Sequence, residues 1–89
     1  MSEENLQSLA TGFILLHLRK SIPYTQLQVM RLCDIHPKRY YALEQGKTLF
    51  TQEEKASLLA LYNITDTYLN KLIHGKLMSL LQDMKKNNI

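Results

Sequence analysis

Apolar residues recur along the chain at intervals of three and four positions, which is the repeat of one face of an α-helix. Long alternating runs of apolar and polar residues, which would indicate strands, do not occur. The helical pattern covers residues 3–20, 26–32, 37–45, 51–62 and 65–87. We therefore predict an all-α fold, a compact bundle of about five helices in which the C-terminal helix extends the core.

The first of these segments, residues 3–20, carries more apolar side chains than one helical face requires. The main stripe and the residues that broaden it are Leu6, Leu9, Ala10, Phe13, Leu16 (or His17), Ile14, Leu15 and Leu18. We predict that this helix is central to the core or that it shares a face with another subunit.

Residues 25–46 have the features of a helix-turn-helix, in which two short helices are joined by a tight turn. Thr25 is placed to cap the first helix, and Asp34 tolerates the left-handed conformation that a sharp turn needs. Pro37 suits the first position of the second helix, and Gly46 supplies a left-handed cap after its end. The sequence therefore predicts a helix-turn-helix within these boundaries.

The second helix of this unit has one apolar and one polar face. The spacing predicts that Ile35, Tyr40 and Leu43 face the core. It predicts that Lys38, Tyr41 and Gln45 form the exposed side. Lys38 and its neighbour Arg39 lie at the helix N-terminus, where the macrodipole is already positive. Cations at this end cost some stability, so they indicate a function that needs an anion, such as a phosphodiester backbone.

Two further helices follow. Thr51 to Glu54 form a capping box, in which a Thr and a Glu three residues later satisfy each other's backbone donors. The last helix, residues 65–87, carries an apolar stripe longer than a four-helix core can cover, which predicts a partner. We predict a dimer interface made by Leu77, Leu80, Leu81 and Met84. The alternatives are that this helix folds back on the first one, or that Gly75 breaks it in two.

The net charge of +3 is concentrated in one part of the chain. Residues 19–47 contain six cations and two anions, and the remainder contains five cations and six anions. A basic excess on the helix-turn-helix fits a nucleic-acid partner, although a solvated surface of this length also reaches such an excess by chance.

The single cysteine and the hydropathy of the chain indicate its compartment. Cys33 falls at an apolar position, which predicts a buried structural thiol and fits a reducing cytoplasm. No apolar run approaches the length that spans a bilayer, and the N-terminus lacks the basic flank of a secretory signal. We therefore expect a cytoplasmic protein that makes no membrane contact.

The segment from Leu15 to Ile64 resembles the Cro/CI-like (XRE) helix-turn-helix family of bacterial and phage DNA-binding regulators. The run LRKSIPYTQLQ is similar to the end of the family's first helix and the start of its second, with Gln26 at the family's usual Gln. Ile35 falls at the apolar residue after the turn, and LEQGK at residues 43–47 resembles the family's I-E-x-G-K ending. The resemblance covers more than half of the chain.

This resemblance implies a transcriptional regulator, such as a repressor, that binds double-stranded DNA as a homodimer and recognises a pseudo-palindromic operator. It implies a lambda-repressor-like bundle with a helix-turn-helix DNA-binding domain at residues 1–64. The apolar stripe of the last helix assigns residues 65–89 to a C-terminal extension that serves as a dimerisation element. The helix at 37–45 would then lie in the major groove. The residues expected at base edges are Pro37, Lys38, Arg39 and Tyr41. The residues expected at the DNA backbone are Thr25, Gln26, His36, Gln45, Lys47 and Thr48. The side chain of Gln26 would also steady the recognition helix.

A second hypothesis is a helix-turn-helix that binds another protein, as an antitoxin does, with weak or no DNA binding. It is favoured by the apolar C-terminal stripe and by Met30 and Asp34, which stand where the XRE family usually has Ala and Gly. An enzyme is not expected, because the sequence has no Gly-rich phosphate loop and no evident Cys–His or Ser–His–Asp set. We expect no cofactor and no metal, since Cys and His do not occur at ligand spacing.

Overall fold

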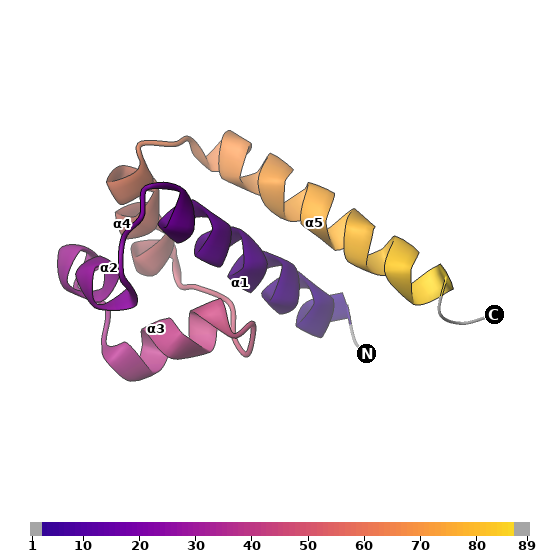
Figure 1. The fold of residues 1–89 in the computed structure, drawn as a ribbon, viewed down its shortest axis with the longest axis horizontal. Coiled ribbons are helices and arrows are strands. Elements are labelled where there is room, and N and C mark those ends of the chain that lie inside the picture. The colour runs from indigo at the N-terminus through magenta and orange to yellow at the C-terminus, as the bar shows by residue number, and fades with distance from the viewer. Residues whose placement is uncertain (1–2, 87–89) are drawn as a thin grey trace.

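The structure is a computed structural model of the chain and describes residues 3–86. This part of the chain forms five α-helices and no strand, so the predicted all-α bundle is confirmed (Figure 1). The helices are α1 (Glu3–Ser21), α2 (Gln26–Cys33), α3 (Pro37–Glu44), α4 (Gln52–Tyr62) and α5 (Asp66–Lys86). Their bounds fall within one or two residues of those that the sequence predicts, apart from the predicted end at Asn87, which lies outside the described residues.

The first helix lies in the middle of the molecule. It contacts α5 along one side and α3 along another, and α1 and α5 run side by side in opposite directions (Figure 1). The short helix α2 packs against α3 and α4. The molecule is elongated, with a longest dimension of 44 Å against 25 and 23 Å. The prediction of a central first helix is therefore confirmed.

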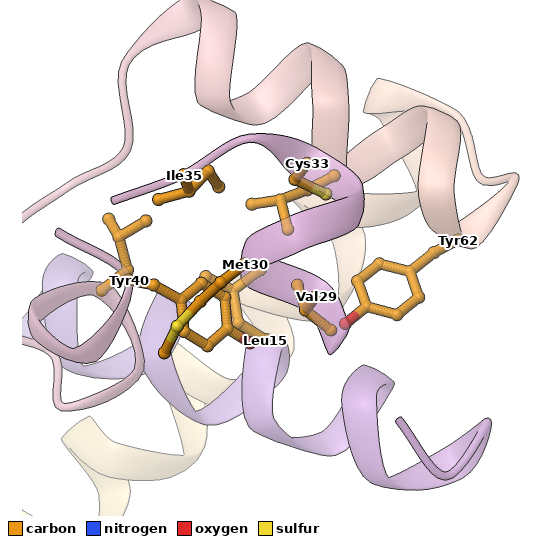
Figure 2. Close-up of a cluster of buried hydrophobic side chains, with 9 residues drawn as sticks. Leu15, Val29, Met30, Cys33, Ile35, Tyr40 and Tyr62 are labelled. Atoms are coloured by element: carbon orange, nitrogen blue, oxygen red, sulfur yellow. The ribbon is translucent and has the colours of Figure 1, made fainter. Parts of the chain in front are cut away.

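Two hydrophobic clusters share α1. The larger surrounds α2 and holds the buried side chains of Leu15, Val29, Met30, Cys33, Ile35, Tyr40, Leu43, Leu58 and Tyr62 (Figure 2). The smaller joins α1 to α5 through the buried side chains of Ala10, Ile14, Leu69 and Ile73. Since each fully buried Leu, Ile or Val contributes about 1.5–3 kcal/mol, both clusters contribute to stability, and α1 is needed for each of them.

The apolar stripe predicted for α1 is only partly correct. Leu6, Ala10 and Ile14 are buried as expected, but Phe13 keeps 47% of its surface exposed and Leu16 is half-buried. The reason is that Phe13 lies beside the contact between α1 and α5, where the Lys76 side chain of α5 covers only part of its ring. The predicted excess of apolar residues therefore remains partly on the surface.

A glycine allows α1 to lie very close to the end of α3. A Cβ atom added to Gly12 would meet the backbone oxygens of Glu44 and Leu43 at 2.7 and 2.8 Å, and the backbone nitrogen of Gly46 at 2.9 Å. These distances are shorter than ordinary van der Waals contacts, and the atoms concerned are all backbone atoms. Because Gly12 has no side chain, the C-terminal end of α3 rests directly on the α1 backbone.

The last helix is continuous through Gly75, so the break considered for this position does not form. Leu69 and Ile73 are buried against α1, and Leu77 and Leu80 are partly buried on the same cluster. The arrangement in which this helix folds back on the first one is therefore the one observed. No helix formed by residues 3–86 is long and apolar enough to cross a membrane.

Candidate nucleic-acid interface

The helix-turn-helix predicted at residues 25–46 is formed by α2, a turn and α3. Thr25 Oγ1 accepts a hydrogen bond from the Gln28 amide at 3.1 Å, and the Thr25 amide donates to Gln28 Oε1 at 2.8 Å. This is a complete capping box, of which the sequence indicated only the Thr. Asp34 has a φ of 53°, the left-handed conformation predicted for it, and the turn ends α2 there.

The second helix of the helix-turn-helix, α3, begins with a histidine cap. His36 Nδ1 accepts a hydrogen bond from the Lys38 amide at 3.2 Å, and Pro37 occupies the first helical position as predicted. Sequence reasoning assigned His36 to the DNA backbone and did not recognise it as the cap, because Ser, Thr, Asp and Asn are the usual residues there. Gly46 follows the helix with a φ of 74°, in agreement with the prediction.

The two faces of α3 are oriented as the sequence predicts. Tyr40 and Leu43 are fully buried in the larger cluster, and Ile35 is buried just before the helix. Lys38, Tyr41 and Gln45 are exposed at spacings of three and four. One side of α3 is thus anchored in the core while the other presents an ammonium group, a phenol and an amide to solvent.

A polar network fixes the C-terminal end of α3. The Arg19 guanidinium forms two hydrogen bonds with the Glu44 carboxylate, at 2.8 and 3.1 Å, and a third with the Tyr24 carbonyl oxygen at 3.1 Å. Gln26 Nε2 donates to the same carboxylate at 3.3 Å. Only 12% of the Arg19 side chain and 5% of the Glu44 side chain are exposed. The hydrogen bond to Glu44 raises the pKa of Arg19 further above its ordinary value.

This network includes Gln26, which the sequence assigned to the DNA backbone. The Gln26 amide contacts α3, which is the steadying role that the XRE resemblance implies for it. Arg19 and Glu44 are 25 positions apart, and sequence reasoning did not connect them. Because the network ties α1, the start of α2 and the end of α3 together, it sets the orientation of α3.

Two buried phenols lie beside the network. The hydroxyl of Tyr62 is buried and has no hydrogen-bond partner within the described structure, and the buried hydroxyl of Tyr40 lies near the Glu44 carboxylate. Burial is the main cause that raises the pKa of both phenols, and the negative Glu44 carboxylate acts in the same direction. Both side chains are therefore neutral at physiological pH, so the charge of Glu44 is balanced by Arg19.

Arg39, predicted to reach base edges, is turned toward the protein. Its guanidinium donates to Glu54 at 2.9 and 2.6 Å, to Thr48 Oγ1 at 3.4 Å and to the Leu49 carbonyl oxygen at 3.1 Å. The hydrogen bond to Glu54 raises the pKa of Arg39 and lowers that of Glu54. Arg39 thus joins α3 to the start of α4, and its 40% exposed side chain lies beside the interface as a support.

The remaining predicted DNA contacts lie on the surface. Thr25, His36, Pro37, Lys38, Tyr41, Gln45 and Lys47 are exposed, whereas Gln26, Arg39 and Thr48 are half-buried. Of the six cations in residues 19–47, Arg19 and Arg39 form ion pairs with described side chains. The other four, Lys20, Arg31, Lys38 and Lys47, form none there. The positive field of the helix-turn-helix therefore comes from fewer groups than the sequence count suggests.

Sequence reasoning overlooked two exposed leucines on α2. Leu27 is 52% exposed and Leu32 is 61% exposed, because both lie outside the face formed by Val29, Met30 and Cys33. Leu27 also lines a shallow hollow of about 480 Å³ that extends to Pro37 at the start of α3. The spacing of the buried residues on α2 was the signal that could have identified these leucines.

The residues predicted for a dimer interface lie on the C-terminal half of α5. Leu77 and Leu80 are half-buried against the cluster shared with α1, and Leu81 is also half-buried. Met84 is 38% exposed and Met78, a neighbour on the predicted stripe, is 44% exposed. An apolar surface therefore remains here after α5 has packed on α1, although it is smaller than the stripe in the sequence.

The described residues contain no group of three or more His, Cys, Asp or Glu side chains arranged to hold a metal ion. Cys33 is a free, buried thiol as predicted, and burial raises its pKa. Comparison of the chain with protein-family models, with curated proteins and with solved structures gives no match. The function must therefore be argued from the geometry of this helix-turn-helix.

Proposed function

We propose that this protein is a sequence-specific regulator that binds double-stranded DNA and inserts α3 into the major groove, as regulators of the Cro/CI-like type do. The observation that carries the proposal is the way α3 is held. It is fixed by Glu44 at its end, by Tyr40 and Leu43 in the core and by Arg39 on its flank. Its opposite face is a row of exposed polar side chains. A rigid helix with free donors and acceptors is what recognition of base edges requires.

The base contacts belong to the first turns of α3, since the N-terminal residues of a recognition helix approach the bases. Lys38 donates to guanine O6 or N7, and the Tyr41 ring and hydroxyl reach the neighbouring base edge. Pro37 adds apolar contact with the groove. Arg39 instead holds α3 against Glu54, so we assign it to positioning.

The DNA backbone is contacted on both sides of α3. Thr25 and Gln26 lie at the N-terminus of α2, where backbone amides and the helix dipole favour a phosphate. Lys47 and Thr48 follow α3, and Gln45 and His36 lie at its two ends. Phosphate contacts at these positions fix the register of the protein on the duplex without reading sequence.

The regulator acts as a homodimer. Two recognition helices about 34 Å apart, one turn of the double helix, match a pseudo-palindromic operator. The exposed apolar side chains on the C-terminal half of α5, Met78 and Met84 among them, support self-association there.

Two lysine variants test the proposal with DNA fragments from around the protein's own gene. We expect Lys38→Ala to weaken binding to the specific fragment by about 1–3 kcal/mol while random duplex is bound as before. Lys47→Ala should weaken both and reduce the slope of log affinity against log salt by about one unit. Fluorescence anisotropy between about 50 and 200 mM salt measures both effects.

Lys71→Ala serves as the matched control, because Lys71 is exposed on α5 and lies outside the helix-turn-helix. Its affinity for both duplexes should equal that of the wild type. An equal loss on specific and random duplex for Lys38→Ala would remove Lys38 from base recognition. If no duplex is bound even at low salt, the proposal is wrong.

A second candidate function is protein binding by the helix-turn-helix. Leu27 and Leu32 favour it, because exposed leucines on α2 suit a protein partner better than a phosphate backbone. The same salt titration separates the two functions, since duplex binding that weakens steeply with salt is specific to the first. For the second, Leu27→Ser and Leu32→Ser would remove partner binding and leave the fold intact.

A further inference from the structure

A shallow groove between α1 and α5 is not used by the proposed DNA interface. It is a hollow of about 430 Å³ lined by Phe13, Ile14, Leu16, His17, Lys20, Leu72 and Lys76. We call it the α1–α5 groove. Its floor is apolar and its three basic side chains come from both helices. The groove lies beside the contact between α1 and α5, where Phe13 remains partly exposed.

The apolar floor of the groove exposes hydrophobic surface to water, which is unfavourable in the isolated protein. Phe13 is 47% exposed, so a partner that covers its ring would remove further apolar surface from water. Phe13, Leu16 and Lys20 follow one another at three and four positions, so they form one stripe along about two turns of α1. Such a stripe offers successive sites to the side chains of an elongated partner.

The charges around the floor specify the partner's chemistry. Lys76 Nζ lies 4.4 Å from the centre of the Phe13 ring, a cation–π contact that holds the ammonium group over the aromatic floor. His17 and Lys20 line the groove on the α1 side. No acidic residue lines it, and none of the ion pairs among the described side chains involves these basic groups. The groove therefore complements a ligand that is apolar along one line and acidic beside it.

Within residues 5–86, no element of a second copy of this chain supplies that chemistry. A symmetric contact through the groove would bring the basic groups of both copies together, which like-charge repulsion disfavours. In residues 5–86 the carboxylates outside ion pairs are those of Asp34, Glu53 and Asp83. These lie in the turn after α2, in α4 and in α5, so no single element of that part of the chain combines several acids with an apolar stripe.

We infer that the α1–α5 groove binds an acidic amphipathic helix of another protein. Two antiparallel helices form a trough that accepts a third helix, with anchors at positions i, i+3 or i+4 and i+7. The anchors contact Phe13, Leu16 and Leu72, and flanking Glu or Asp side chains meet Lys20 and Lys76. The groove is lined by α1 and α5 alone, so the partner and DNA can be bound together. The inference does not depend on the proposed function.

The probe is a fluorescein-labelled peptide of about 14 residues built from Leu, Ala and Glu. Its Leu residues recur at three and four positions with Glu on both flanks. A second peptide has Lys in place of each Glu, and a third has the first composition in scrambled order. We expect saturable binding of the first peptide to the full chain by anisotropy, a gain in peptide helicity by circular dichroism, and no binding of the other two.

Three variants locate the binding. Phe13→Ala should weaken it about tenfold through lost apolar contact, and Lys20→Glu combined with Lys76→Glu should weaken it at least as much. The double charge reversal should in turn bind the Lys-containing peptide, which a merely unfolded protein cannot do. Lys71→Glu, an exposed reversal on α5 outside the groove, should change the affinity by no more than about twofold. Circular dichroism of each variant checks the fold.

Three results would overturn the inference. One is that the first peptide fails to bind the wild type, and another is that the scrambled peptide binds equally well. The third is that the protein binds vesicles of phosphatidylglycerol but not the peptide, and that the charge reversals abolish vesicle binding. This result would identify a lipid surface as the ligand. Since all measurements use the protein without DNA, failure here is distinguishable from failure of the DNA-binding proposal.

Discussion

At the scale of single residues, the ion pair between Arg19 and Glu44 holds the C-terminal end of α3 to α1. Both side chains are largely buried, and the carboxylate also accepts a hydrogen bond from Gln26. When one partner of a buried pair is removed, the other charge remains in a poorly solvated site. The pair is therefore costly to break, even where its net contribution to stability is small.

We expect Glu44→Gln to lower the free energy of unfolding by about 2–4 kcal/mol, because Arg19 then remains as a buried unpaired charge. Urea denaturation followed by circular dichroism measures this change. Glu53→Gln is the control, since Glu53 is exposed on α4, and should cost no more than about 0.5 kcal/mol. Equal losses for the two variants would show that the Arg19–Glu44 pair does not hold the helices together.

The second ion pair, between Arg39 and Glu54, predicts a pH dependence. The hydrogen bond from Arg39 lowers the pKa of Glu54 below its ordinary value of 4.5. The folded protein therefore favours the carboxylate, so the stabilisation is present above pH 4.5 and is lost as the pH falls through the folded pKa. Because Arg39 is partly exposed, we expect a contribution of only about 0.5–1 kcal/mol at neutral pH.

Glu54→Gln isolates this contribution, since Gln keeps the capping box with Thr51 but carries no charge. The difference in unfolding free energy between wild type and variant should be largest at neutral pH and should vanish in acid. Arg39→Gln should show the same pH profile. A difference that stays constant down to acidic pH would mean that the pair does not cause the shift.

At the scale of secondary-structure elements, caps and packing support one another. The eight-residue helices α2 and α3 are too short to be stable in isolation, since isolated helices below about 12–15 residues are marginal in water. Thr25 and His36 cap their starts, and Asp34 and Gly46 allow the chain to leave them. Their mutual orientation, however, depends on contacts with α1 and α4.

Two glycines in long helices should respond to the same substitution in opposite ways. Gly12→Ala places a Cβ against the backbone of Glu44 and Leu43, so we expect a net loss of about 1–3 kcal/mol. Gly75→Ala meets nothing within 4 Å and should gain up to about 1 kcal/mol from helix propensity. Thermal and urea unfolding of both variants measures the two effects. A stabilising Gly12→Ala would mean that α1 and α3 are not in close contact.

At the scale of the whole molecule, two free surfaces lie on different elements. The polar face of α3 and the helix N-terminus of α2 form the proposed DNA side. The α1–α5 groove lies between α1 and α5, and further exposed apolar side chains lie on the C-terminal half of α5. The helix α5 packs on a different side of α1 from α3 (Figure 1). The central α1 contacts both α3 and α5.

The predicted homodimer is best tested at Met84. Leu80 is half-buried against α1, so a charge at Leu80 would also disturb the monomer, whereas Met84 is 38% exposed. We expect Met84→Asp to convert a dimer into a monomer without loss of helicity, because a carboxylate is costly to bury in an apolar interface. Analytical ultracentrifugation measures the mass. Gln82→Asp adds the same charge at an exposed neighbouring position and should leave the dimer intact.

An unchanged dimer for Met84→Asp would place the interface on another surface of the molecule. A wild-type protein that is monomeric at micromolar concentrations would contradict the dimer itself. The latter result would leave DNA binding to be tested separately, since a monomer can still recognise one half-site.

The sequence by itself determined the helices, several of their caps and the two faces of α3. These features depend on neighbours within about one helical turn, so local spacing and the conformational preferences of Thr25, Asp34, Pro37 and Gly46 were enough to predict them. The burial of Tyr40 and Leu43 opposite an exposed Lys38 followed from the same periodicity. For this reason the all-α fold and the outline of the candidate interface were predictable.

Only the tertiary structure decided which charged groups are free and which apolar surface remains. Arg19 and Glu44 lie 25 positions apart, Arg39 and Glu54 lie 15 apart, and spacing along one helix carries no information about such pairs. The exposure of Phe13 likewise depends on where α3 and α5 pack on α1. Non-local contacts pair Arg39 with Glu54, so Arg39 is not a free cation. They also determine that the α1–α5 groove stays exposed.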